Sequence, residues 1–537
     1  MEGGKAFCTR HKALLQQATI AAFPKDRAKF VRDHAHGACG DEFGWTVELM
    51  VYILDDPRTR EDVTALMIDV ANGAFPEVVS QRLNAARLTG VGKLTGGIRP
   101  LAMTATLMKL PGALLLRGHA DVIRDHYLPI QLGIGVPSGS EIITHKVRDF
   151  VAASADAIVA ALDIVAGFQG PYRSAMKREL SDPKWRGLWR FWNAYYAKPS
   201  TLYVYNGSAY EEISSQRGSK QGCSWGSFLF ALVLHPTLRK MAARFPHLVI
   251  LAYIDDVTIL GTDPAMVAEA ILWFNNEIKV ELGSELNLKK CQWYSAMHPI
   301  PDCLKTQPST DASPRNAMEA VSVLKVLGVY HGPDHLVREA LNKDASAHQL
   351  LFDRLKCLPL HPAVVALSKS ALPRMSHVIR THPPDLTQEA CKVFDNFVER
   401  AWSDWALVNP NDATRVVAAL PHRHGGAGFT RIALTAQHAY NASLESCSTG
   451  GRTKTQSSQK KRCDDMYRAA RAELAASGAT SEAFLTECSA KGSGAWLVDA
   501  AVEQYIRDDA VSAALRRNAP HIRSFPRVKS ETTLVRW

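Results

Sequence analysis

The chain has 537 residues, of which 46% are hydrophobic and 22% charged, an ordinary globular composition that allows a sizeable core. Its net charge of +10 and pI of about 9.0 favour a polyanionic partner, nucleic acid first and an anionic membrane second. The ten cysteines form no CxxC pair, the N-terminus lacks a signal-peptide core, and no apolar run reaches ~18 residues. These absences argue against a zinc ribbon, a disulfide framework and a membrane span, so we expect an intracellular protein with reduced thiols.

Helices are expected in the first 90 residues, where VTALMIDVANG has apolar positions at helical spacing and Asn72-Gly73 forms an end. From about 91 to 145 the chain is dense in glycine and proline, as in GVGKLTGGIRP and QLGIGVPSG, which predicts loops and short strands. Residues 155–332 alternate β-rich runs with helices and include a loop-like stretch, PDCLKTQPSTDASPRN.

Helical patterns dominate again from about 335 to 440, as in EACKVFDNFVERAW. The segment STGGRTKTQSSQKKR, residues 448–462, is polar, basic and free of large apolar side chains, which is typical of a linker. A shorter helical tail is expected over residues 463–537.

Residues 247–261, HLVILAYIDDVTILG, place Asp255 and Asp256 between two β-rich runs, where a tight hairpin turn would put polar residues. A plain turn is one interpretation, since other aspartate pairs exist; Asp55-Asp56, before Pro57, is interpreted as a helix start. Only Asp255-Asp256 is enclosed by buried-looking strands on both sides. A metal site is therefore the second interpretation of this pair.

A second acidic position strengthens the metal interpretation. The run ADAIVAALDIVAGF, residues 155–168, is apolar apart from its aspartates, and Asp163 interrupts its core. If this strand lies beside the hairpin, Asp163 and Asp255 meet at one edge of a sheet and raise each other's pKa unless a cation lies between them. Mg²⁺ prefers such hard oxygen ligands and shares its remaining positions with phosphates. Two such ions ~4 Å apart would support nucleotidyl transfer.

Two helices are expected near these aspartates. The segment SKQGCSWGSFLFALVLHPTLRKMAARF, residues 219–245, begins as a turn of small residues and continues as a long apolar helix. Asp263-Pro264 has the pattern of an N-cap and first helical position, and the helix should end near Gly283.

In their order and spacing, these elements resemble the palm of a reverse transcriptase. Asp163 corresponds to the aspartate of the first catalytic motif, Gln221-Gly222 to the QG pair, and YIDD at 253–256 to the YxDD box. Further similar segments are GGIRPLAMTATLMKL, QLGIGVPSGSE, LNLKKC and VLGVYHG, so the resemblance extends over about residues 60–440. The chain is most similar to the site-specific non-LTR retrotransposon type, which includes the spliced-leader-associated elements of trypanosomatids.

The resemblance implies roles for individual residues. Asp163, Asp255 and Asp256 would be the catalytic, metal-binding carboxylates, holding two Mg²⁺ ions, with Mn²⁺ as an alternative. The residues expected to bind nucleotide or template are Arg99, Phe168, Gln221, Gly222, Tyr253 and Lys290. Phe168, five residues after Asp163, stands where the family carries an aromatic steric gate against ribonucleotides, although a plain core position is the competing interpretation. The sequence does not show which of the adjacent residues Lys289 and Lys290 has this nucleotide-binding role.

The implied fold is an α/β right-hand polymerase with an α+β palm. Its expected parts are an N-terminal helical region (1–90), fingers and palm (91–332), a helical thumb and post-thumb (333–447), the basic linker (448–462) and the helical tail (463–537). Relatives continue past a segment like KGSGAWLVDA into a zinc knuckle and a nuclease, and the sequence leaves open whether these residues are a piece of a longer element.

The resemblance implies an RNA-directed DNA polymerase that extends a primer 3′-hydroxyl with dNTPs, on an RNA template, at a DNA primer or target, without a membrane partner. Two alternatives remain: an RNA-dependent RNA polymerase, which Phe168 disfavours, and an inactive retroelement remnant that only binds nucleic acid. An intracellular, nuclear location is implied, with RTKTQSSQKKR as a weak import signal. The oligomeric state is not indicated.

Overall fold

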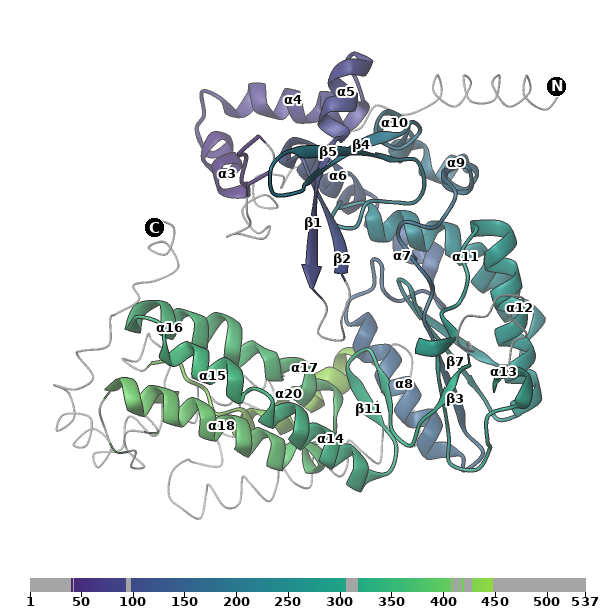
Figure 1. Ribbon diagram of the computed structural model, residues 1–537, viewed down its shortest axis with the longest axis vertical. Coiled ribbons are helices and arrows are strands. Elements are labelled where there is room, and N and C mark those ends of the chain that lie inside the picture. Colours follow the sequence, from purple (N-terminus) through teal and green to yellow (C-terminus); the bar gives the residue numbers. More distant parts are fainter. Residues whose placement is uncertain are drawn as a thin grey trace. The chain divides into compact units, whose positions relative to one another are not determined.

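The computed structural model describes residues 40–41, 43–92, 98–305, 317–406, 409, 415, 418–419 and 427–447. The chain divides into two compact units (Figure 1). The first combines Met1–Gly139, Ile158–Trp293 and His298–Ala320, and the second combines Ser140–Ala157, Tyr294–Met297 and Val321–Trp537. The predicted linker and tail, residues 448–537, lie outside the described residues. The mixture of helices and sheets agrees with the predicted α/β class.

The first unit opens with the helices predicted for this region, α3 (Val47–Asp55), α4 (Arg60–Asn72) and α5 (Glu77–Asn84). Helix α4 ends as the sequence predicts, because Gly73 adopts a left-handed conformation with φ 59°. The helix start predicted at Asp55-Asp56 was wrong. Asp55 ends α3, and Asp56 leaves the helix in an extended conformation while its carboxylate accepts a hydrogen bond from the Arg58 N–H.

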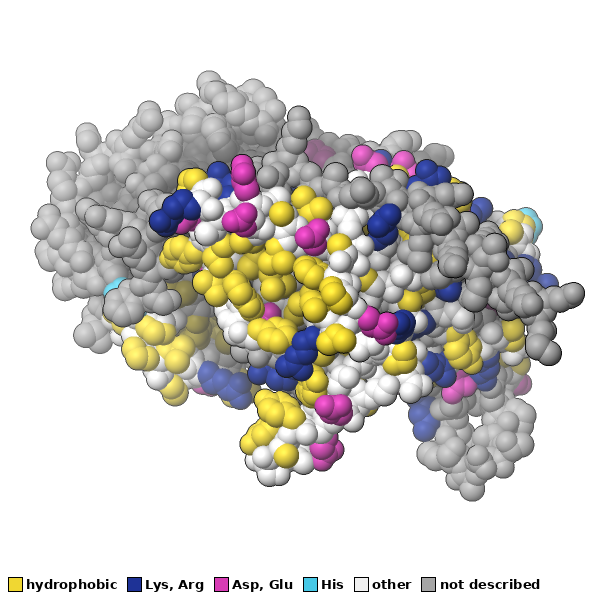
Figure 2. Space-filling model, turned by 90° about the horizontal axis from the view of Figure 1, so that it is seen from above, with side chains coloured by type: hydrophobic (Ala, Val, Ile, Leu, Met, Phe, Trp, Pro, Cys, Tyr) yellow, Lys and Arg dark blue, Asp and Glu magenta, His cyan; other side chains and the backbone are white. Residues whose placement is uncertain are grey.

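A four-stranded sheet follows, in the order β2-β1-β4-β5. Its strands are β1 (Ala86–Gly92), β2 (Ile98–Thr104), β4 (Ser200–Tyr205) and β5 (Tyr210–Ser215). Strands β1 and β2 form an antiparallel ribbon, and β4 joins β1 in parallel. Figure 2 shows hydrophobic side chains gathered on the face seen from above. Exposed large hydrophobic residues of α3, α5 and the β4–β5 hairpin are Leu49, Tyr52, Val78, Val79, Tyr205, Tyr210 and Ile213.

The loops and short strands predicted for residues 91–145 are correct at residues 128–138, which lie outside any helix, and as far as β2. Beyond it the chain forms α6 (Thr106–Gly118), α7 (Ala120–Tyr127) and α8 (Gly139–Ala153). Pro111 and Gly112 lie inside α6. Gly112 serves close packing rather than a turn, since a Cβ there would lie 2.9 Å from the Phe191 ring and 3.1 Å from that of Trp225. Tertiary contact therefore overrides the local preference of these residues for loops.

A five-stranded sheet, in the order β6-β7-β3-β8-β9, carries the first unit's central core. Its strands are β3 (Ile158–Leu162), β6 (Val249–Tyr253), β7 (Asp256–Gly261), β8 (Gln292–Ser295) and β9 (Glu319–Ala320). The long helices α11 (Gly226–Arg244) and α12 (Pro264–Leu282) run beside this sheet in Figure 1 and contact its strands. Fully buried side chains such as Phe230, Ile259 and Phe274 fill the interface.

Helix α12 confirms the boundaries predicted from its sequence. The Asp263 carboxylate accepts hydrogen bonds from the backbone N–H groups of Ala265 and Met266, at 2.9 and 3.4 Å, and Gly283 ends the helix with φ 65°. The turn and helix predicted for residues 219–245 are also confirmed by α11. Shorter helices of this unit are α9 (Arg173–Leu180), η1 (Pro183–Trp185), α10 (Arg186–Tyr195), η2 (Leu288–Lys290) and α13 (Asp302–Lys305).

The second unit is mainly helical, as predicted for residues 335–440. A two-stranded ribbon, β10 (Leu324–Val326) with β11 (Val329–His331), precedes its helices. These are α14 (Asp334–Ser346), α15 (Gln349–Lys356), α16 (Leu360–Ala366), η3 (Leu367–Ala371), η4 (Leu372–Met375), α17 (Ser376–Thr381), α18 (Pro384–Ala406) and α20 (Ile432–Cys447). Helix α8 is tied to them, because Glu141 accepts hydrogen bonds from Arg380 at 2.7 and 2.8 Å and from Ser443 at 2.6 Å.

Within the described ranges, every helix is too short or too polar to cross a lipid bilayer.

Candidate active site

Asp163 stands at the end of the central strand of the five-stranded sheet. It directly follows β3, whose last residue, Leu162, pairs with Val257 of β7. Because β3 and β7 are antiparallel, one further step along the register brings Asp163 level with Asp256, the first residue of β7. The structure therefore brings these two predicted site residues to the same edge of the sheet.

Asp255 occupies the turn that joins β6 to β7, as predicted. Tyr253 pairs with Asp256, so the connection contains only Ile254 and Asp255. Ile254 adopts φ 59°, whereas two-residue hairpin turns usually have glycine, asparagine or aspartate at such a position. A β-branched residue in this conformation is strained. Such strain persists only where surrounding contacts hold the backbone in place.

Gln131 supplies those contacts. Its Oε1 accepts a hydrogen bond from the Ile254 N–H at 2.7 Å, and its Nε2 donates to the Ile254 carbonyl at 3.0 Å. The Gln131 side chain is fully buried, and its Oε1 also accepts from the Gly133 N–H at 3.0 Å. The backbone of residues 130–132 runs beside β6, where Ala252 exchanges hydrogen bonds of 2.8 Å with Ile130 and Leu132. One amide thus fixes the turn that presents Asp255.

Asp255 and Asp256 lie close enough to Asp163 for its charge to affect their ionisation. Burial, followed by the charges of Asp255 and Asp163, raises the pKa of Asp256 to about 6. Burial chiefly raises the pKa of Asp255 as well, and the charge of Asp163 adds to the rise. Arg99, from β2, opposes that rise by its positive charge. Burial, with the repulsion between neighbouring carboxylates, thus favours the protonated forms of Asp255 and Asp256.

Residues 285–291 hold Asp163 from the other side. The Asp163 carbonyl accepts a hydrogen bond from the Asn287 N–H at 2.8 Å, and its N–H donates to the Cys291 sulfur at 3.4 Å. The Lys290 Nζ lies 3.7 Å from the Asp163 Oδ2, with both side chains substantially exposed. The structure thereby distinguishes the two adjacent lysines, because Lys290 and not Lys289 pairs with Asp163 in the described part of the chain.

Gln221 and Gly222 form the turn before α11 and lie against β2. The Gln221 carbonyl accepts a hydrogen bond from the Ala102 N–H at 2.7 Å. Gly222 has φ 110°, and a Cβ on it would lie 2.7 Å from the Ala102 carbonyl oxygen. Only glycine satisfies both conditions. The turn and the strand that carries Arg99 are therefore joined directly.

Phe168 contacts the segment just before this turn, and its neighbour Gly167 lies near Asp255. The Phe168 carbonyl accepts the Ser219 N–H at 2.7 Å, and its ring stacks on Phe230 with centroids 5.7 Å apart. The side chain is half-buried, so it retains an exposed part that a core phenylalanine would lack. Gly167, next to it, lies close to Asp255, since a Cβ on Gly167 would be 3.5 Å from the Asp255 Cβ.

The described side chains around the three aspartates do not form a complete metal-coordination shell by themselves. Over the described residues, no set of three or more His, Cys, Asp or Glu side chains is gathered tightly enough to hold a metal ion by itself. The donor chemistry nevertheless fits Mg²⁺, which commonly takes one or two carboxylates and completes its shell with water and substrate phosphates. The raised pKa values of Asp255 and Asp256 support the same conclusion, since a cation would relieve the repulsion that contributes to them.

Sequence reasoning missed two supporting residues. Gln131 and Cys291 lie in segments whose pattern was noticed, QLGIGVPSGSE and LNLKKC, but neither received a role. For Gln131, the sequence signal is a polar residue between apolar neighbours. For Cys291, it is a cysteine at the end of the motif LNLKKC. Neither pattern names the partner, which lies 123 residues away for Gln131 and 128 for Cys291.

Comparisons with known proteins agree with this geometry. Residues 130–330, which contain the three aspartates, match the family model described as reverse transcriptase (RNA-dependent DNA polymerase). The Retrotransposable element SLACS 132 kDa protein of Trypanosoma brucei gambiense is 25% identical over 511 residues, or 92% of this chain and 41% of that protein. The chain thus spans about two fifths of the length of this relative.

A solved structure of apo telomerase from Candida tropicalis, truncated from the C-terminal domain, superposes with a TM-score of 0.32 at 12% identity. The superposition covers 47% of this chain and 54% of that chain. The sequence matches and the arrangement of the three aspartates lead to the same conclusion. Residues 130–330 form a reverse transcriptase domain, and the chain is related to the protein of a trypanosome non-LTR retrotransposon.

Proposed function

We propose that this protein extends the 3′-hydroxyl of a DNA primer with deoxynucleotides on an RNA template. The observation that carries the proposal is the position of Asp163 at the end of β3, beside the two-residue turn that presents Asp255 and leads into Asp256. Carboxylates gathered at a sheet edge suit nucleotidyl transfer, because the reaction builds negative charge that bound cations can balance.

Divalent ions would be held by Asp163, Asp255 and Asp256. Reverse transcriptases use such ions as a family, and the hard oxygen donors here favour two Mg²⁺ ions, with Mn²⁺ as a substitute. When bound, the ions would activate the attacking hydroxyl and stabilise the leaving pyrophosphate. The role of the protein is positional, since β3 and the Gln131-clamped turn bring the carboxylates to one place before substrate arrives.

Two cationic side chains have complementary proposed roles. Arg99 would bind the triphosphate of the incoming nucleotide, supported by its electrostatic effect on Asp255. Lys290 would donate a proton to the departing pyrophosphate or bind its oxygens, supported by its position 3.7 Å from the Asp163 carboxylate.

Four further residues would form the nucleotide and template pocket. The exposed part of Phe168 would lie against the deoxyribose and exclude a 2′-hydroxyl. Gln221 and Gly222, fixed against Ala102 of β2, would flank the incoming and templating bases. Tyr253, which closes β6 opposite Asp256, would support the primer end.

The same proposal assigns fingers and palm to residues 91–332 and thumb and post-thumb to residues 333–447, following an N-terminal helical region. The four-stranded sheet would serve the fingers and the five-stranded sheet the palm. Helices α14 to α20 would supply the thumb. A nuclear location, where a DNA target would be found, is part of the proposal and is supported by the basic residues of 452–462.

Primer extension tests the proposal. An oligo(dT) primer on poly(rA) is incubated with dTTP or UTP and Mg²⁺, using the wild type, Asp255→Ala and Asp302→Ala, the last altering an exposed aspartate outside the site. We expect dTTP incorporation by the wild type and Asp302→Ala only. Incorporation of UTP would instead identify an RNA polymerase. Template binding without extension in any of the three proteins would identify an inactive nucleic-acid-binding remnant.

A further inference from the structure

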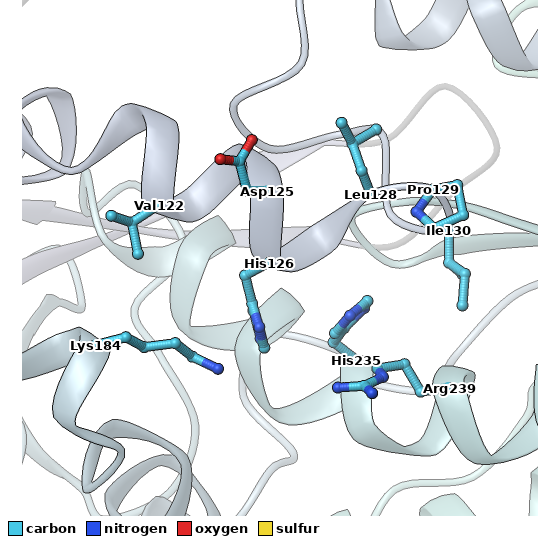
Figure 3. Close-up of a pocket in the computed structure, with 9 residues that line it drawn as sticks. All are labelled: Val122, Asp125, His126, Leu128, Pro129, Ile130, Lys184, His235 and Arg239. Carbon is cyan, nitrogen blue, oxygen red and sulfur yellow. The ribbon is translucent and has the colours of Figure 1, made fainter.

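A second cluster of basic side chains surrounds a cavity formed by α7, η1, α11 and the segment after α7. The cavity has a volume of about 700 Å³. His126, Lys184, His235 and Arg239 direct their nitrogen-bearing ends toward the same space (Figure 3). No role in nucleotide transfer was assigned above to any of these four residues.

His235 is the most unusual member of this cluster. It is only 1% exposed, and neither ring nitrogen has a hydrogen-bond partner within the described residues. The backbone of His126 lies close enough to oppose, in part, the lowering of the pKa of His235. The His126 Nε2 is likewise buried and unpaired, and the two rings meet edge to face with centroids 4.8 Å apart. Buried polar atoms are normally paired, so two such rings beside a cavity point to a ligand that would pair them.

The charges around the cavity are predominantly positive. Lys184 pairs with Asp182 at 3.1 Å, and both side chains are partly exposed. The Asp125 carboxylate turns away from the space in Figure 3 and pairs with Arg124 at 3.0 Å. For Arg239, the described part of the chain provides no ion-pair partner closer than 4.0 Å. A net excess of donors therefore faces the cavity.

This excess affects the histidines. Burial first, then Lys184 and Arg239, lowers the pKa of His126 to about 4, with Asp182 opposing the shift. Burial first, then His126, Arg239 and Lys184, lowers the pKa of His235 to about 4. Both rings are therefore neutral near pH 7, chiefly because they are buried and also because cations lie near them.

We propose that this cavity binds a nucleotide-sized ligand through its phosphate group. Phosphate accepts several hydrogen bonds at once and matches a lysine, an arginine and two imidazoles. Apart from Asp125, the rest of the lining is apolar, including Val122 and Ile130, and would pack against a base or sugar. The volume lies within the ~300–1,000 Å³ typical of small-molecule sites. The phosphate could belong to a free nucleotide or to a nucleotide within a strand.

Phosphate binding would also change protonation. An anion between the four side chains favours the charged form of both imidazoles, so the protein would take up protons when the ligand enters. A metal ion fits the cavity less well, because the same lysine and arginine would repel it. In agreement, the described residues contain no cluster of metal-ligating side chains here.

Calorimetry on the full chain tests the inference, with EDTA present so that metal-dependent binding at Asp255 does not contribute. The probes are UMP, uridine, inorganic pyrophosphate and a short oligouridylate, each measured in two buffers of different ionisation enthalpy near pH 7. We expect UMP to bind with proton uptake and uridine to give no detectable heat. Arg239→Gln and Lys184→Gln should each weaken binding about tenfold, as for the loss of one charged hydrogen bond.

His235→Asn is compared with the matched exposed change His247→Asn, and melting curves verify that each variant is folded. If His235→Asn does not fold, Arg239→Gln still decides. If UMP and pyrophosphate bind as well as the oligonucleotide does, the ligand is a free phosphate compound. If the oligonucleotide alone binds, and Arg239→Gln weakens that binding, the ligand is a nucleotide within a nucleic-acid strand. Equal heats for uridine and UMP, affinities unchanged by the variants, or the absence of proton uptake would each overturn the inference. Because no primer is extended, this outcome is independent of the polymerase proposal.

Discussion

The amide of Gln131 holds the backbone of Ile254 on both sides, accepting its N–H at 2.7 Å and donating to its carbonyl at 3.0 Å. Ile254 has φ 59°, a conformation that costs an isoleucine ~1–3 kcal/mol. The clamp therefore stabilises a strained residue immediately before Asp255. The buried Gln131 side chain, near the start of the segment that matches the reverse transcriptase family, thereby fixes the turn that presents Asp255, a proposed catalytic residue.

Gln131→Ala should reduce primer extension more than it reduces stability. Loss of both hydrogen bonds leaves buried backbone groups unpaired and lowers the free energy of unfolding by ~1–3 kcal/mol. A small displacement of Asp255 should lower kcat by ~10–100-fold. KM for the nucleotide should change little, because Gln131 does not line the nucleotide pocket. Steady-state kinetics and chemical denaturation measure the two effects.

The control is Gln81→Ala, which removes an exposed glutamine of α5 whose side chain donates a hydrogen bond to Glu77. It should leave both kcat and stability near wild type. If Gln131→Ala changes kcat and KM in proportion to the fraction unfolded, Gln131 is a structural residue and does not position Asp255.

Gly222→Ala should damage the turn before α11. The new Cβ would lie 2.7 Å from the Ala102 carbonyl, and φ 110° is a conformation that alanine rarely adopts. We expect a loss of at least ~1–3 kcal/mol in the free energy of unfolding and lower dNTP affinity. Gly118→Ala is the matched control, since Gly118 lies in α6 with open space around it, and alanine there should be neutral or stabilising. Equal melting temperatures for the two variants would contradict the prediction.

The sequence predicts well those features that depend on neighbouring residues. The β6–β7 hairpin follows from two β-rich runs around Asp255-Asp256, and α12 follows from Asp263-Pro264 at one end and Gly283 at the other. Each signal lies within a few residues of its consequence, so local preference and tertiary structure agree. The position of Asp163 beside Asp256 depends on two strands that are far apart in the sequence. The resemblance to the palm of a reverse transcriptase is what predicts that these strands are neighbours.

Features that depend on distant partners were missed for a physical reason. Gly112 indicates a loop when considered locally, yet in α6 it permits close contact with Phe191 and Trp225. Gln131 has no local pattern that names Ile254 as its partner. Sequence periodicity reports which face is buried, but it does not report which polar group across the core completes a hydrogen bond.

Lys290→Met should impair catalysis, whereas Lys289→Met should not. Of these two lysines, Lys290 is the one that pairs with the Asp163 carboxylate in the described residues, at 3.7 Å, and we therefore propose it as the proton donor to pyrophosphate. A loss on the order of 10²-fold in the chemical step is expected for removal of a general acid. Single-turnover incorporation, which isolates the chemical step, measures this loss in Lys290→Met beside Lys289→Met. Comparable defects in both variants would assign the pair a general electrostatic role instead.

Phe168→Ala should relax the choice between deoxy- and ribonucleotides. If the exposed part of the ring excludes the 2′-hydroxyl, its removal should reduce the ratio of kcat/KM for dTTP over UTP by ~10–200-fold. Phe230→Leu is the matched comparison, because Phe230 stacks on Phe168 at 5.7 Å but is fully buried. It should lower stability without changing the ratio. A ratio unchanged in Phe168→Ala would identify Phe168 as a core residue only.

The second unit should lose stability in acid through His382. This buried ring accepts a hydrogen bond from the Tyr330 N–H through Nε2 at 3.0 Å and lies 3.1 Å from the Val378 carbonyl through Nδ1. Accepting at Nε2 requires the neutral ring. Burial first, with the charge of Arg148 next, lowers the pKa of His382 to about 3. Because the folded pKa lies below the unfolded value of ~6.5, the stabilisation is complete above pH 6.5 and is lost as pH falls toward 3.

Urea denaturation between pH 7 and pH 4 measures this effect. The free energy of unfolding of the wild type should fall by up to ~1.4 kcal/mol per pH unit for each proton that the protein binds on unfolding. His145 contributes in the same direction, since burial lowers its pKa to about 3. His382→Gln should be less stable at pH 7, because glutamine reproduces the two contacts imperfectly, but its stability should fall less steeply with acid. His335→Gln, an exposed change on α14, should keep the wild-type slope. A slope unaltered in His382→Gln would show that the ring is already charged in the folded protein, in conflict with its acceptance of the Tyr330 N–H.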